Sequence, residues 1–198
     1  MSTQKRSSTN ITTLTECAIM MALSFALSCA KLFEMPMGGS VTVASMLPVM
    51  LISIKYGVGI GLSTCFVYSF TQLIQAVASA NVFPYCETPA TLVLCILFDY
   101  LVPFTILGLA GLFHKMKLTK NTEINIYIGI ISVVILRFLC HFITGVVIWG
   151  QWAPEGMGKY LYSCLYNGSF LSLDFIICIV CAVLMFRKAE LRRLVNID

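Results

Sequence analysis

The sequence predicts an all-α membrane protein, a bundle of six transmembrane helices with both chain ends in the cytoplasm. Three observations predict this fold. The 198 residues are 59% hydrophobic and only 11% charged, with a mean hydropathy of +0.90, whereas about a quarter of the residues in a soluble domain are charged. Six apolar runs follow one another along the chain, and the basic residues are concentrated at alternate ends of these runs. A net charge of +4 distributed in this way indicates contact with membrane lipid, and we expect no nucleic-acid partner.

The first apolar run is expected to be a helix that stays in the protein. Residues 1–11 are polar, and the run at 13–30 resembles a signal peptide, but further spans follow it at once. The proline- and glycine-bearing segment 31–44 predicts a loop with a flexible joint. The second run, 45–54, is short for a full span, so we expect a tilted or partly embedded helix there.

Four further runs complete the predicted bundle. They cover residues 58–78, 90–113, 124–149 and 160–186. Each of them is long enough to cross the hydrocarbon core of a bilayer, which takes about 20 residues in a helix. A strongly basic connection separates the second of these runs from the third.

The whole chain, 1–198, is expected to form a single membrane domain. A polar N-terminal segment occupies 1–11, the six helices lie within 12–186, and a basic tail occupies 187–198. With the N-terminus in the cytoplasm, ten Lys and Arg residues fall on the inner side and only two on the outer side. This bias follows the positive-inside rule, so we expect a multi-pass protein of a bacterial plasma membrane with both termini cytoplasmic.

Polar and aromatic side chains are concentrated in the outer half of the predicted bundle. Asp99 lies about ten residues from the outer end of its run, and His141 lies about eight from the outer end of the next run, which ends at Trp149. Tyr162 and Asn167 fall in the first two turns of the last run. A charge at the centre of a membrane helix costs about 2.5–3.5 kcal/mol on insertion scales, so such residues usually mark a functional site.

Four residues at a spacing of four share one face of the fifth predicted helix. They are Arg137, His141, Gly145 and Trp149. Gly145 is expected to leave open space between the histidine and the tryptophan, as the wall of a pocket. Two simpler interpretations stay open, since Asp99 could serve only as an ion-pair partner for Arg137, and Trp149 could be an interfacial belt residue.

These residue types suit a flat, cationic, nitrogen-rich ligand. A carboxylate in a low-dielectric site attracts a cation, and an aromatic face adds about 0.5–2 kcal/mol. Histidine, asparagine and tyrosine supply both donors and acceptors for the edge of a heterocycle. The residues alone therefore indicate small-molecule binding near the outer face, without naming the ligand.

The sequence does not indicate an enzyme. It has no HExxH, no GxSxG and no complete P-loop. Most of the nine cysteines lie inside apolar runs, where they are expected to be small hydrophobic residues. We therefore expect no catalytic residue, no metal site and no cofactor.

Several stretches of the chain carry a resemblance to a known family. They are KLFEMPMGGSV and MLPVMLISIKYG in the first third, FDYLVPFTILGLAGLF around Asp99, and RFLCHFITGVVIWGQWAPEG followed by YSCLYN near the end. Over nearly the whole chain, the sequence resembles the thiamine-specific substrate-binding (S) components of energy-coupling-factor vitamin transporters. That resemblance implies a six-helix bundle that binds thiamine and is not itself an enzyme.

The resemblance also implies roles for the polar residues. Asp99 stands where the family has an acidic residue, often glutamate, that faces the thiazolium cation, and Tyr100 follows it as in the family. Trp149 matches the ring that stacks on the pyrimidine. His141, Tyr162 and Asn167 match positions that form hydrogen bonds to the polar groups of the ligand.

Two further regions are implied less directly. The segment 31–43 resembles the lid between the first two helices, although this chain has a Gly-Gly pair where some relatives have a tryptophan. Tyr85, between the third and fourth helices, is a weaker candidate for ligand contact.

Ala18, Ala22 and Ala26 lie at four-residue spacing in the first helix. Small residues at this spacing let helices approach closely. In the resembling family such a face docks on the membrane coupling subunit, which carries two ATPase subunits, so Ala18 and Ala22 are predicted to form the partner surface. Packing inside the bundle is the alternative.

The predicted function is therefore capture of thiamine at the outer face, for uptake driven by partner ATPases of an energy-coupling-factor (ECF) transporter. Three alternatives stay open. The chain could be an S component for another vitamin or a thiamine precursor. It could be a small membrane enzyme that uses Asp99 and His141 as an acid–base pair, or a structural subunit that binds no small molecule.

Overall fold

Helices make up most of the structure, a computed structural model that describes residues 2–80 and 82–195. The uninterrupted helices of ten residues or more are α1 (Ser2–Cys29), α2 (Leu47–Tyr56), α3 (Val58–Ser79), α7 (Thr122–Val147) and α8 (Lys159–Phe186). The shorter elements are β1 (Lys31–Glu34), η1 (Pro36–Gly38), β2 (Ser40–Thr42), η2 (Phe83–Tyr85), α4 (Pro89–Cys95), η3 (Ile96–Leu101), α5 (Val102–Ile106), η4 (Leu107–Leu109), α6 (Leu112–Met116), η5 (Trp149–Trp152) and α9 (Ala189–Leu194).

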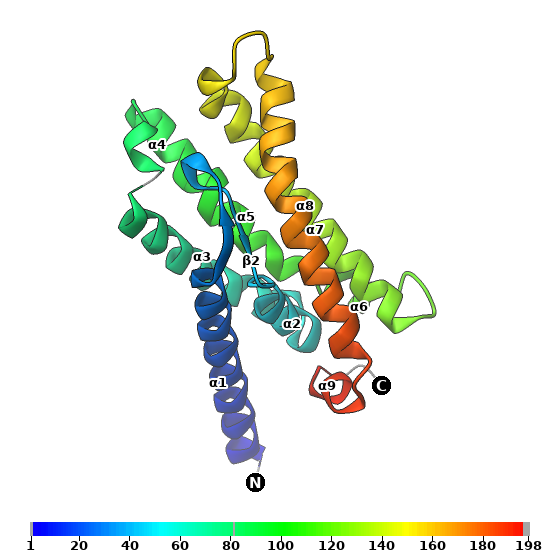
Figure 1. Cartoon of the computed structure of the whole chain (residues 1–198). Helices are drawn as coiled ribbons and strands as arrows, with labels where there is room; N and C mark the ends of the chain where they lie inside the picture. The colour runs from blue at the N-terminus through cyan, green and yellow to red at the C-terminus, as the bar shows by residue number, and fades with distance from the viewer. Residues whose placement is uncertain (1, 81, 196–198) are drawn as a thin grey trace.

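Five segments of the described chain are long and apolar enough to cross a membrane. They are Asn10–Cys29, Val58–Ser79, Pro89–Met116, Thr122–Val147 and Lys159–Phe186. Each corresponds to one of the six predicted apolar runs. Figure 1 shows α9 and the start of α1 at one end of the bundle, and the connection between η5 and α8 at the other.

The remaining predicted run, 45–54, forms α2, which is only ten residues long. Every residue from Leu47 to Ile54 is buried, and the flanking Met46 is fully enclosed. α2 therefore packs among the other helices in the main hydrophobic core. Its short length fits this position, because a helix that is covered by protein does not have to match the thickness of a bilayer.

The segment predicted as a loop at 31–44 is instead an antiparallel hairpin of β1 and β2, so the described chain is not entirely α-helical. Lys31 pairs with Thr42 and Glu34 with Ser40. The turn between the strands contains Gly38, whose φ of 105° lies in the region that favours glycine. Val41 is buried against Phe170 and Leu171 of α8, and this apolar contact anchors β2 on the bundle.

The fourth membrane segment is not a continuous α-helix, as the apolar run 90–113 had suggested. α4 passes into η3, a π-helical turn, and η3 passes into α5. Pro103 lies near the start of α5 and has no N–H for the carbonyl of Asp99, four residues earlier. A π-helical turn directly before a proline accommodates that missing bond, and such turns are frequent at functional sites. The turn carries Asp99 and Tyr100.

Both chain ends are more helical than the sequence predicts. α1 begins at Ser2, although 1–11 was expected to be a polar segment outside the first helix. The sequence of α1 contains neither proline nor glycine, so nothing in it terminates the helix at the membrane boundary. The tail at 187–198, predicted only as basic and polar, contains α9.

Gly145 allows α7 and α8 to approach closely, and does not leave open space as predicted. A β-carbon at this position would clash with Oγ of Ser163 and would lie 2.8 Å from Nδ2 of Asn167. The volume beside the missing side chain is thus filled by α8. This close approach brings Asn167 to the backbone of α7.

We expect Gly145→Ala to destabilise the protein, because the added methyl group has no room between the two helices. Overpacking of this kind typically costs about 1–3 kcal/mol, which predicts a lower Tm in a thermal-shift measurement on detergent-purified protein. Gly168→Ala is the matched control, since its β-carbon would meet only Phe138, at 3.9 Å. Equal Tm values for the two variants would contradict the proposed packing role of Gly145.

Candidate functional site

A pocket lies between the β1–β2 hairpin and the neighbouring parts of α3, η3, α7, η5 and α8. It brings together six of the seven residues that the sequence singles out for ligand contact. These are Asp99, Tyr100, His141, Trp149, Tyr162 and Asn167. They come from four separate elements that meet around one cavity.

Asp99 accepts hydrogen bonds from three side chains, two of which, His141 and Trp149, line the pocket. Nδ1 of His141 lies 3.0 Å from Oδ1, and Nε1 of Trp149 donates to Oδ2 at 3.2 Å. Thr144 donates its hydroxyl to Oδ1. The carboxylate is only 12% exposed, so these donors fix its orientation and replace part of its hydration.

Arg137 does not form the ion pair with Asp99 that one interpretation of the sequence allowed. Its Nε donates to Nε2 of His141 at 3.3 Å, and its guanidinium carbon lies 4.4 Å from the centre of the Phe104 ring. Within the described residues, no carboxylate is in direct ion-pair contact with Arg137. Asp99 therefore keeps its charge available to the pocket.

Trp149 lies just beyond the end of α7, although the sequence placed it on the same helical face as His141. α7 ends at Val147, and Trp149 opens the 3₁₀ turn η5. The turn aims the indole N–H at Asp99. Trp152, at the other end of η5, packs on Trp149 with ring centres 5.8 Å apart.

Asn167 is held by the backbone of both helices that it joins. Its Nδ2 donates to the carbonyl of His141 at 3.1 Å and to that of Ser163 at 3.0 Å. Ser163 in turn donates to the carbonyl of Phe142 at 2.9 Å. These bonds fix the position of α8 along α7. They therefore also fix where Tyr162, which is on α8, lies in the pocket.

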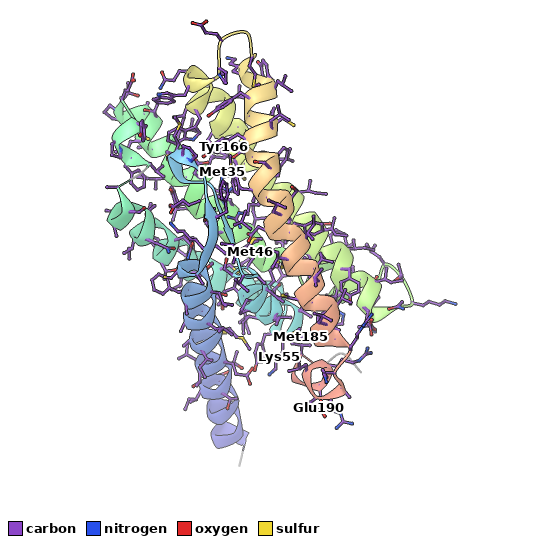
Figure 2. The ribbon with its side chains drawn as sticks, viewed as in Figure 1. Met35, Met46, Lys55, Tyr166, Met185 and Glu190 are labelled. Atoms are coloured by element: carbon purple, nitrogen blue, oxygen red, sulfur yellow. The ribbon has the colours of Figure 1, made fainter. Side chains whose placement is uncertain are left out.

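The hairpin covers the pocket and is tied to it by Tyr166. The Tyr166 hydroxyl donates to the carbonyl of Pro36 and accepts from the backbone N–H of Gly39 at 3.4 Å. Figure 2 shows Tyr166 beside Met35 near the tip of the hairpin. The segment 31–43, predicted as a lid, therefore lies over the candidate site in this structure.

Several pocket residues were not predicted from the sequence. Tyr166 lines the pocket and lies one helical turn after Tyr162, so the spacing of the two tyrosines was the signal for it. Gln72 and Gln75 of α3 also line the pocket. Their signal was present in the sequence as two amides, three residues apart, inside an apolar run.

Tyr85 is the one candidate that lies outside the residues lining the pocket. Its ring packs edge-on against Trp152, with centres 5.5 Å apart. Tyr85 is 39% exposed. Trp152 in turn packs on Trp149, so a row of aromatic rings links Tyr85 to the site.

Ala18 and Ala22 are exposed on α1, as is Ala26. The side of α1 that faces the bundle instead carries the buried residues Cys17, Ser24 and Ser28. The alanine face is therefore not packed inside this bundle, which was the alternative to partner docking. Among the described residues, no cluster of His, Cys, Asp or Glu could hold a metal ion.

Comparison with known proteins identifies the family of the chain. Residues 14–193 match the model of the family described as "Thiamine transporter protein". The thiamine transporter ThiT of Bacillus subtilis is 34% identical over 185 residues, which cover 89% of this chain and 91% of that protein. ThiT of Lacticaseibacillus paracasei is 34% identical over 89 residues, covering 41% of this chain and 44% of that protein.

A solved structure has the same fold. ThiT from Listeria monocytogenes superposes with a TM-score of 0.71 at 21% identity, covering 92% of this chain and 98% of that one. The family is one of transporters, which confirms the prediction that this chain is not an enzyme. The family match extends over most of the chain, from the first membrane helix to the C-terminal α9, and the chain belongs to the thiamine transporter protein family.

Proposed function

We propose that the chain is the membrane subunit that captures thiamine at the outer face of the cell, in the pocket around Asp99. The observation that carries the proposal is the carboxylate itself, which is oriented by His141, Thr144 and Trp149. Among the described residues, no Lys or Arg is in ion-pair contact with it. A fixed, weakly hydrated carboxylate beside an indole ring suits the thiazolium cation of thiamine. His141, Tyr162 and Asn167 supply the polar groups for the pyrimidine.

In the proposed topology, six helices are embedded in the membrane and both termini are cytoplasmic. Ten Lys and Arg residues on the inner side against two on the outer side support this orientation. The pocket then opens outward, and the hairpin at 31–44 closes over a bound ligand. Tyr166, which bonds to the hairpin, would hold the closed state.

Transport requires partners, and we propose an ECF coupling subunit with two ATPase subunits. The exposed alanine face at Ala18 and Ala22 supports docking of the coupling subunit on α1. The described chain itself carries no nucleotide-binding motif, so the energy for release into the cell would come from those ATPases.

Fluorescence of the detergent-purified protein, titrated with thiamine, tests the proposal. The chain has two tryptophans, and Trp149 is the one that lines the pocket. We expect saturable quenching, because a cationic aromatic ligand stacked on an indole quenches its emission. Trp149→Phe should lose this response.

Trp152→Phe is the matched control, since Trp152 belongs to the same turn but does not line the pocket. It should keep the quenching by thiamine. If the unmodified protein shows no quenching by thiamine and binds none at equilibrium, the proposed function is wrong and one of the alternatives has to replace it. Quenching by an isolated pyrimidine or thiazole at lower concentrations than by thiamine would favour a precursor as the substrate.

A further inference from the structure

A second carboxylate lies below the pocket, on α8, and the proposed thiamine site makes no use of it. Asp174 is 3% exposed and lies within a membrane helix. A buried charge there has to be stabilised by partners.

Asp174 is bound to the base of the hairpin. Its Oδ1 accepts from the backbone N–H of Thr42 at 3.0 Å and from the Thr42 hydroxyl at 2.9 Å. The hydroxyl of Ser45 lies 2.7 Å from that of Thr42. These neutral groups orient the carboxylate, but they do not compensate its charge.

Arg137 is a buried cationic side chain that could compensate this charge. The guanidinium is 8% exposed and contacts the sulfur of Met46, the residue labelled in Figure 2 directly before α2. Asp174 and Arg137 are both buried and contact the same short segment, Asp174 through Thr42 and Arg137 through Met46. Nε of Arg137 also donates to His141, the residue that holds Asp99.

The charges of this buried group do not sum to zero when His141 is neutral. With both carboxylates ionised, Arg137 contributes one positive charge, and Asp174 and Asp99 contribute one negative charge each. If Asp174 compensates Arg137, the charge of Asp99 is left over, and the group as a whole carries a net charge of −1. A ligand with a single positive charge would neutralise it.

From this arrangement we propose that Asp174 is a specificity-determining residue: it neutralises Arg137 and thereby reserves Asp99 for a cationic ligand. The inference rests on the proposed thiamine-binding function and adds the reason why the site selects a cation. Without the Asp174 charge, the charge of Arg137 is left to attract Asp99, and Arg137 then competes with the ligand. Asp174 acts through Arg137, so it is a positioning residue that touches no ligand.

The test compares a cationic ligand with a neutral one of the same shape. The probes are thiamine and 3-deazathiamine, in which an uncharged ring replaces the thiazolium. Asp174→Asn keeps the size of the side chain and an oxygen that can accept from Thr42. We expect this variant to bind thiamine at least tenfold more weakly and to change the affinity for 3-deazathiamine less than threefold.

Two further variants separate charge from packing. Thr42→Val removes the hydroxyl bond but keeps the carboxylate, so the ratio of the two affinities should stay that of the unmodified protein. Arg137→Met together with Asp174→Asn removes both charges and should restore most of the preference for thiamine. The double variant also keeps the test valid if Asp174→Asn alone does not fold.

Equal losses for both ligands in Asp174→Asn would overturn the inference, because they would indicate anchoring of the hairpin and no effect of charge. A double variant without restored preference would overturn it as well. If the unmodified protein binds no thiamine, the proposed function fails and the inference fails with it. If it binds thiamine and the variants lose both ligands alike, only the inference fails.

Discussion

Replacing Asp99 by asparagine is expected to weaken thiamine binding by about 100-fold, or about 2.7 kcal/mol. The change keeps the size of the side chain and one oxygen for the His141 and Thr144 donors, but removes the charge that faces the cation. Two unit charges 4 Å apart attract each other by about 4 kcal/mol at an effective dielectric constant of 20. Part of that energy is offset by the smaller desolvation cost of the neutral amide. Equilibrium binding of labelled thiamine to the purified protein measures the effect.

Two controls isolate the contribution of the charge. Glu87→Gln removes a carboxylate from an exposed position in the connection between α3 and α4, and should leave the affinity within about twofold because a solvated charge is screened. Asp99→Glu keeps the charge on a side chain that is one methylene group longer. Unchanged binding in Asp99→Asn would remove Asp99 from the site.

The sequence predicted which polar residues lie together better than it predicted the backbone that carries them. Polar side chains are rare in membrane helices, so Asp99, His141 and Asn167 stand out in a single sequence without any knowledge of the fold. The depth of each residue in the membrane follows from the helical rise of about 1.5 Å per residue. These depths alone predict that the three residues lie in one layer of the bundle. The structure places all three at the same pocket.

The contacts between these residues could not be predicted in the same way. The π-helical turn before Pro103 rotates the chain that carries Asp99, and a regular helix was the natural expectation from the run 90–113. Similarly, α7 ends before Trp149, so the indole reaches Asp99 from a 3₁₀ turn and not from the helical face of His141. Both departures decide which group Asp99 bonds to.

Tertiary packing also reversed two local interpretations. Gly145 indicated space, but whether a missing side chain leaves a gap or admits a neighbour depends on the facing helix, and here α8 fills it. From the sequence, Arg137 and Asp99 were expected to be able to form an ion pair, because they carry opposite charges on neighbouring membrane helices. Asp174, which we propose as the partner of Arg137, is 37 positions further along the chain. Only the packing of α8 beside α7 places both side chains in the interior of the bundle.

Ala22→Trp is expected to abolish thiamine uptake by cells that express the complete transporter, while the purified subunit keeps its affinity for thiamine. Ala22 is exposed on α1, so an indole there meets no other part of the described bundle. It would, however, prevent the close approach of a partner helix that small residues allow. Ala18→Trp should act in the same way, because the two residues are one helical turn apart on the same face.

Leu23→Trp is the control that separates an effect of the alanine face from a general effect of added bulk on α1. Leu23 is also exposed on α1, at 46%, but it lies about 100° around the helix from Ala22, away from both the alanine face and the buried face. It should therefore face lipid and tolerate the larger side chain. Loss of uptake in Ala22→Trp but not in Leu23→Trp, with thiamine binding intact in both, would assign the alanine face to partner docking. Loss of binding in Ala22→Trp would instead show that α1 supports the pocket, and equal loss of uptake in both variants would show that α1 tolerates no added bulk on any exposed face.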